Sequence, residues 1–172
     1  EANASFYIDQ VTRKISESLE LTRDVAFNAI ADGTLREAMQ NTSSFLNSAG
    51  RDALQSSVGS TVAFQSIWGD RFLNGIYLFR DDGQSTSYTP YGSYVQEQRR
   101  MQRLYEETLD QSSARTLFCP ENGAENKTYF ILDYKNIDTL DHLGKLIIEL
   151  NTETLISSGE LLELYPNTCL TL

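Results

Sequence analysis

The spacing of apolar side chains changes near residue 72, and this change constrains the fold more than any other feature of the sequence. Before it, apolar residues recur three or four positions apart, which is the period of an amphipathic helix. After it, short runs of strand-favouring residues alternate with turn signals such as Asp81-Asp82-Gly83. Helices followed by strands exclude the alternating order of a doubly wound parallel sheet and indicate an α+β fold.

The first part of the chain predicts helices only. A long amphipathic helix is expected over Ser5–Ala31, ended by a glycine stop at Asp32-Gly33. Thr34 and Glu37 have the spacing of a capping box for a short second helix. A third segment, over Ser43–Phe64, keeps the helical spacing.

The second part predicts five strands, with a helix over Tyr94–Leu109 after the second of them. The strands are expected at Phe72–Phe79, Ser85–Thr89, Arg115–Cys119, Thr128–Tyr134 and Leu143–Leu150. A further helix over Thr152–Leu161 and a terminal strand from about Thr168 follow. This order predicts an antiparallel sheet with helices packed on its faces.

The last of the five strands has two different sides. Alternation places Leu146, Ile148 and Leu150 on one side and Lys145, Ile147 and Glu149 on the other. We therefore expect one dry sheet face and one of mixed polarity. The long helix is expected on one face, and a ligand pocket on the face opposite to it.

The charge of the chain excludes some partners. The 172 residues carry 24 Asp and Glu against 14 Lys and Arg, a net charge of −10. Nucleic acids and anionic membrane surfaces require clustered Lys and Arg, so neither is expected as a partner. No apolar run approaches the roughly 20 residues of a membrane span. The chain lacks an initiator Met and ends in a predicted strand, and we interpret it as a segment of a longer protein.

Residues that carry chemistry are sparse. His142 is the single histidine and sits in a turn, so we interpret it as a solvated turn residue. Two cysteines, Cys119 and Cys169, do not form a zinc site, and whether they form a disulfide is left open. No nucleophile motif or phosphate-binding glycine loop occurs. No metal, no cofactor and no catalysis by this chain are therefore predicted.

Tyrosines around the predicted sheet suggest a binding site, because their apolar rings and polar hydroxyls suit a small polar ligand. The predicted pocket is walled by Tyr77, Tyr88, Tyr91, Arg99 or Arg103, and Tyr129 or Asp133. Three other interpretations stay open. The tyrosines would be ordinary packing residues, the arginines a solvated helix face, and Asp133 a cross-strand partner of Lys145.

Three stretches after the long helix carry a resemblance. They read LNGIYLFRDDGQSTSYTP, TYFILDY and LGKLIIELNTETL, and the chain resembles the extracytoplasmic PAS-like (Cache) sensor domains of bacterial transmembrane receptors. The nearest type is the sensor histidine kinase of two-component systems. The resemblance implies a five-stranded antiparallel sheet with the long helix on one face. It divides the chain into a helical segment (1–70), the sensor module (71–165) and the start of a membrane-proximal strand or module (166–172).

The resemblance also implies a function. The chain would be an extracellular domain between two membrane helices, dimeric in the full receptor, that transmits the binding of an unknown small molecule. Self-association is expected through the helix stripe Ile8, Val11, Ile15 and Val25. The Trp-Tyr pair of amino-acid-binding members is missing between Tyr94 and Tyr105, so that ligand class is not carried over. The alternatives are a chemoreceptor sensor domain, a secreted interaction or adhesion module without a small-molecule ligand and, more weakly, a glycan hydrolase.

Overall fold

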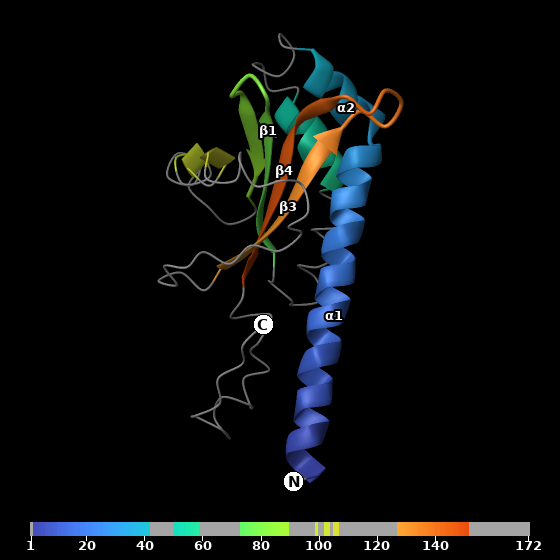
Figure 1. The fold of residues 1–172 in the computed structure, drawn as a ribbon, viewed down its shortest axis with the longest axis vertical. Coiled ribbons are helices and arrows are strands. Elements are labelled where there is room, and N and C mark those ends of the chain that lie inside the picture. The colour runs from blue at the N-terminus through green and yellow to red at the C-terminus, as the bar shows by residue number, and fades with distance from the viewer. Residues whose placement is uncertain are drawn as a thin grey trace.

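A computed structural model gives the fold of this chain (Figure 1). It describes residues 2–41, 50–58, 73–89, 99, 102–103, 105–106 and 127–151. The elements are α1 (Ala2–Ala31), α2 (Gly33–Gln40), β1 (Leu73–Arg80), β2 (Ser85–Tyr88), β3 (Lys127–Lys135) and β4 (His142–Asn151). Residues 50–58 and the described positions between 99 and 106 are also helical. The α+β class is thereby confirmed.

The four described strands form one antiparallel sheet in the order β2-β1-β4-β3. β1 and β4 are the central strands, and both are buried along nearly their whole length. Four of the five predicted strands correspond to β1, β2, β3 and β4, and their predicted ends agree with the observed ends to within one or two residues. The predicted strand Arg115–Cys119, the helix Thr152–Leu161 and the strand from Thr168 lie outside the described residues, as do Cys119 and Cys169.

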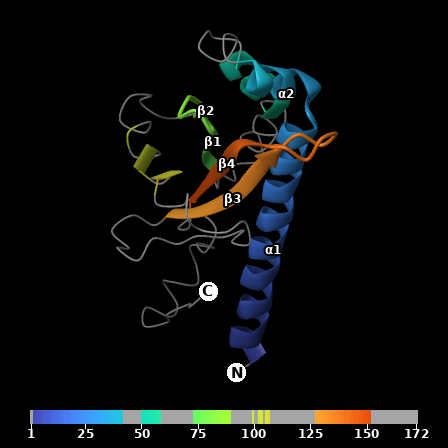
Figure 2. The same cartoon turned by 45° about the horizontal axis from the view of Figure 1, so that its top comes forward.

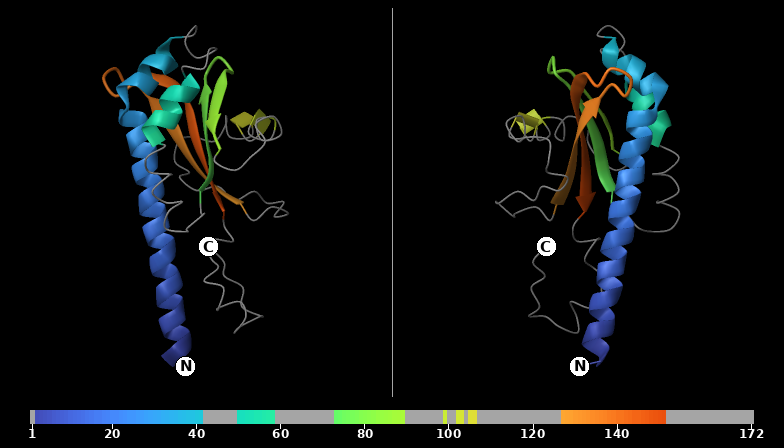
Figure 3. Two further views of the ribbon diagram at one scale, coloured as in Figure 1. Left: turned by 180° about the vertical axis from the view of Figure 1, so that it is seen from behind. Right: turned by 45° about the vertical axis from the view of Figure 1, so that its right-hand side comes forward.

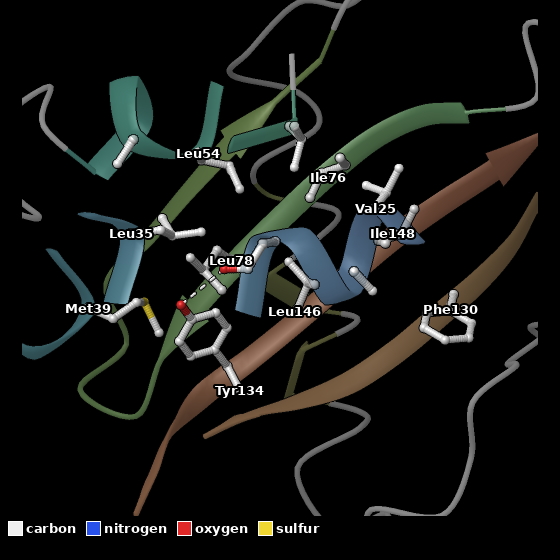
Figure 4. Packing of buried hydrophobic residues seen from close by; sticks show 14 of the residues in the cluster. Val25, Leu35, Met39, Leu54, Ile76, Leu78, Phe130, Tyr134, Leu146 and Ile148 are labelled. Atoms are coloured by element: carbon white, nitrogen blue, oxygen red, sulfur yellow. Dashed lines mark hydrogen bonds between the residues drawn. The ribbon is translucent and has the colours of Figure 1, made fainter. Parts of the chain in front are cut away.

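One face of the sheet is covered by α1, α2 and residues 50–58 (Figures 2 and 3). The core between them is apolar, and Figure 4 shows its centre. Val25 of α1 faces Ile148 of β4, and Leu54 packs from the segment 50–58 (Figure 4). Ala29 and Leu146 belong to the same cluster. Burying these side chains supplies most of the stabilisation of this face, because each fully buried large aliphatic side chain contributes about 1.5–3 kcal/mol.

Tyr134 ties β3 to α1 across this core. Its ring is fully buried, and its hydroxyl donates a hydrogen bond to the carbonyl oxygen of Ala29 at 3.2 Å (Figure 4). Burial, with the nearby carboxylate of Asp32, raises the pKa of the Tyr134 hydroxyl from 10.0 to about 12, although Arg36 opposes this shift. The helix and the sheet are thus joined by a polar contact inside the apolar core.

The junction of α1 and α2 corrects two predictions. Gly33 is the first residue of α2 and is not among the glycines with a positive φ, so no left-handed glycine ends α1. The N-cap of α2 is Asp32, whose carboxylate accepts the backbone N–H of Leu35 at 2.7 Å. The predicted capping box from Thr34 to Glu37 is therefore wrong, because the nearer Asp32 satisfies the free N–H groups of the first turn.

The N-terminal half of α1 extends past the edge of the sheet (Figure 1). Ile8 lies there with 59% of its surface exposed, whereas Val11 and Val25 are buried. The predicted self-association stripe is therefore wrong for Val11 and Val25, because the fold of the chain itself covers them. None of the helices within the described ranges combines the length and the apolarity that a bilayer span requires.

Candidate ligand-binding site

The sheet face opposite α1 is built from aromatic and aliphatic side chains. We call it the aromatic face and define it by Tyr77, Phe79, Tyr129, Ile131 and Ile147. Residues two apart on a strand share a face, and the antiparallel register then brings Tyr77, Ile147 and Ile131 into one row across β1, β4 and β3. The mixed face that was predicted from β4 is confirmed, because Lys145 and Glu149 flank Ile147 on it.

The helical positions between 99 and 106 lie on the side of the sheet opposite α1 (Figure 3). Tyr105 packs from there against the aromatic face. Its ring stacks on Phe79 with the centroids 4.8 Å apart and the planes at 10°. Its hydroxyl donates to the carbonyl oxygen of Arg80 at 3.4 Å. Burial raises the pKa of the Tyr105 hydroxyl, and the carboxylates of Asp81 and Asp82 raise it further. The hydroxyl is therefore held in its neutral form, as a hydrogen-bond donor.

A buried carboxylate lies at one end of the aromatic face. Glu149 is only 1% exposed. Its Oε2 accepts a hydrogen bond from the Tyr77 hydroxyl at 3.3 Å, and its Oε1 accepts one from Asn74 Nδ2 at 3.4 Å. Burying a charged group is costly unless hydrogen bonds compensate for the lost water. Glu149 is thus a carboxylate that the neighbouring strand holds in a fixed place.

The local backbone of β1 makes this arrangement possible. The register shifts between Leu73 and Gly75, where the intervening Asn74 is an extra residue against β4. A bulge of this kind re-aims a side chain, and here it allows Asn74 to reach Glu149. Gly75 lies directly opposite Glu149, and a Cβ there would be 2.7 Å from the Tyr77 hydroxyl oxygen. The missing side chain of Gly75 leaves the space in which the phenol lies.

The other end of the aromatic face carries charges of both signs. Asp133 and the buried Lys145 are direct cross-strand partners, so the prediction that they are neighbours is confirmed. His142 lies beside them, with Nε2 3.6 Å from Asp133 Oδ1 and Nδ1 2.9 Å from Asp81 Oδ2. His142 was interpreted as a solvated turn residue. Its side chain is partly exposed, but it contacts carboxylates of two different elements.

The structure brings three of the predicted site residues together: Tyr77, Tyr129 and Asp133 share the aromatic face. Tyr88 does not join them. It pairs with Ile76 and packs against the core under α1, so the prediction that it walls the same pocket is wrong.

For the remaining three predicted residues, a place on this face stays a prediction. Arg99 and Arg103 are exposed, which agrees with the alternative of a solvated helix face. Tyr91 lies outside the described residues.

Six residues that shape this site were not among the predicted site residues. They are Asn74, Gly75, Phe79, Tyr105, Lys145 and Glu149. The sequence did contain one signal for this site. Lys145 and Glu149 are charged residues in an otherwise apolar strand, and buried charged groups need polar partners. The bulge that supplies Asn74 has no comparable sequence signal.

The arrangement combines buried aromatic side chains with charged side chains at both ends of the face. Within the described ranges, no cluster of three or more His, Cys, Asp or Glu side chains could hold a metal ion. The chain matches no known protein-family model, and no curated protein shows significant sequence similarity to it.

The hydrogen bond between Tyr77 and Glu149 can be tested through stability. Tyr77→Phe removes one donor to a buried carboxylate, so we expect the free energy of unfolding to fall by about 1–3 kcal/mol. Urea denaturation measures this loss. Tyr88→Phe is the matched control, because it makes the same chemical change on the opposite face of the sheet. Equal losses in the two variants would contradict the assigned role of Tyr77.

Proposed function

We propose that this chain is the extracytoplasmic ligand-sensing domain of a bacterial transmembrane receptor, of the PAS-like (Cache) kind, with a histidine kinase as its output module. The observation that supports this most is the aromatic face, where the buried carboxylate of Glu149 is held between an amide and a phenol. The long helix on the opposite face is the second element that such a domain requires. The proposed fifth strand is the one predicted at Arg115–Cys119.

The ligand would lie against the aromatic face, under the helical segment that carries Tyr105. Glu149 at one end and the Lys145–Asp133 neighbours at the other would orient its polar groups. The aromatic rings between them would contact its apolar part. The chain's own part in this function is binding and not catalysis.

The packing offers a route from the ligand to the rest of a receptor. β1 and β4 contribute side chains to the aromatic face on one side and to the core under α1 on the other. A shift of these strands would therefore change the packing on both sides of the sheet. Tyr134 links β3 to Ala29 of α1. In Figure 1, α1 begins and β4 ends toward the same end of the molecule, which suits a domain connected to a membrane at that end. Ligand binding would select one of two positions of α1 relative to the sheet.

The proposed receptor is a homodimer joined to the membrane through flanking helices. Because Val11 and Val25 are buried, the contact between the two copies would involve the exposed part of α1 around Ile8.

A thermal-shift screen against sugars, organic acids and amines tests the proposed function. A ligand at about one hundred times its Kd stabilises the folded chain by about 2.7 kcal/mol. For a domain of this size the Tm then rises by about 5–10 °C. Glu149→Gln should weaken the binding of a hit at least about tenfold, which is the effect of about 1.4 kcal/mol of lost interaction.

The control for this screen is Tyr88→Phe, which lies on the α1 face and should leave binding unchanged. Two outcomes would argue against the proposal. One is a hit whose affinity is insensitive to Glu149→Gln. The other is a hit that depends on Tyr88 and not on Glu149.

A further inference from the structure

His142, the only histidine of the chain, lies between two carboxylates from different parts of the sheet. Nδ1 is 2.9 Å from Asp81 Oδ2 in the turn between β1 and β2, and Nε2 is 3.6 Å from Asp133 Oδ1 on β3. The imidazole side chain is 38% exposed and that of Asp133 is 18% exposed. Protons can therefore reach the ring, while the contact with Asp133 is largely sheltered from water.

The two contacts depend differently on the charge of the ring. A neutral imidazole has one N–H, whereas a protonated imidazole has two. The short distance to Asp81 assigns the N–H of the neutral ring to Nδ1. Nε2 of the neutral ring is then a lone pair that faces the Asp133 carboxylate, and the two do not attract each other. Only the protonated ring is attracted to both carboxylates.

Other charged groups surround this pair of contacts. They are Asp82, which pairs with Arg80 at 3.1 Å, Lys135 opposite His142, Lys145 opposite Asp133, and Asp141, which accepts a hydrogen bond from Thr139. The ring of His142 thus contacts Asp133, and Lys145 lies opposite Asp133 as its cross-strand partner. Imidazoles change charge between about pH 5 and pH 8, whereas ammonium groups ordinarily titrate well above that range.

We propose that Asp133 exchanges partners with pH: protonated His142 holds it in acid, and Lys145 holds it when the imidazole is neutral. The contact between His142 and Asp81 persists in both states, because Nδ1 carries a proton in both. This assignment gives the domain a response to acid that does not depend on the identity of any ligand, and so it goes beyond the proposed function.

The exchange takes place at the charged end of the aromatic face. Asp133 and Lys145 lie there as cross-strand partners, and Asp81 follows Arg80, whose carbonyl oxygen accepts the Tyr105 hydroxyl. A change in the partner of Asp133 alters the charge that a bound molecule would meet. Acid would then modulate the same surface that the ligand occupies.

Two double-mutant cycles on the 172-residue chain test the proposal. The first pairs His142→Gln with Asp133→Asn, and the second pairs His142→Gln with Asp81→Asn. Urea denaturation gives the unfolding equilibrium constant at about pH 5.5 and about pH 8, near the two ends of the range in which imidazoles change charge. We expect the first pair to be coupled about two- to fivefold in acid and uncoupled at the higher pH. The second pair should stay coupled at both.

A measurement on the unmutated chain complements the cycles. The carboxyl carbon-13 signal of Asp133 should move over the same pH range as the ring nitrogen-15 signals of His142. The signal of Asp138, which pairs with Arg36 at 3.5 Å, serves as the control and should stay constant over that range. Coupling between His142 and Asp133 that is equal at both pH values, or absent in acid, would overturn the proposal. So would an Asp133 signal that does not follow the ring.

Discussion

Replacing Gly144 with alanine is expected to lower the free energy of unfolding by at least about 3 kcal/mol, since it combines backbone strain with overlap in a packed sheet. Gly144 has a φ of +153°, and it lies on the central strand β4, where it pairs with Arg80 on β1 and with Tyr134 on β3. A Cβ at this position would lie 1.8 Å from the carbonyl oxygen of Phe79. The overlapping atom belongs to the backbone of β1, so rotation of a side chain cannot relieve the overlap.

Gly83→Ala is the matched control for this substitution. Gly83 also has a positive φ, +83°, but a Cβ there would meet nothing within 4 Å. Its replacement adds strain without overlap and should cost about 1–2 kcal/mol. Urea denaturation of both variants separates the two effects. Equal losses would mean that the close approach of β1 and β4 at Gly144 is wrong.

Raising the pH from about 10 to about 12 is expected to remove about 2 kcal/mol of stability through Tyr134 alone. Its pKa is about 12 in the folded chain, against 10.0 for an ordinary tyrosine. Below pH 10 the hydroxyl is protonated in both states, so its contribution is fully present. Above that value the unfolded chain releases the proton first. The contribution is therefore lost as the pH rises through the folded-state pKa.

Tyr134→Phe isolates this effect, because phenylalanine cannot ionise. We expect the variant to lose about 1 kcal/mol near neutral pH, through the hydrogen bond to Ala29. It should then show a shallower decline in alkali than the unmutated chain. The difference between the two curves between pH 10 and pH 12 is the contribution of Tyr134. Parallel curves over that interval would show that the hydroxyl is not held neutral by burial.

Much of the sheet could be predicted because its strands alternate cleanly. The two sides of β4, with Leu146 and Ile148 toward α1 and Ile147 and Glu149 away from it, follow from a period of two residues. The same rule puts Tyr129, Ile131 and Asp133 on one face of β3. Local periodicity is sufficient for such predictions, since each refers to one strand only.

Predictions about residues on two neighbouring strands depend on the register between those strands. The sequence pattern of each strand alone does not determine that register. Tyr88 was placed beside Tyr77, but the hairpin pairs Tyr88 with Ile76 and so turns it toward α1. A shift of one residue in the register reverses the face of every side chain on a strand. The site around Glu149 was missed for a related reason, because it depends on the bulge at Asn74 and on the space at Gly75.

A nuclear magnetic resonance titration tests most directly whether the aromatic face binds a small molecule. The probe is the best hit of the thermal-shift screen, added to nitrogen-15-labelled chain. We predict that the shifted backbone signals concentrate on Tyr77, Tyr129, Ile147 and Glu149, and that the shifts are lost in Glu149→Gln. Signals concentrated on α1 and residues 50–58, with Glu149 unaffected, would contradict the proposed binding face.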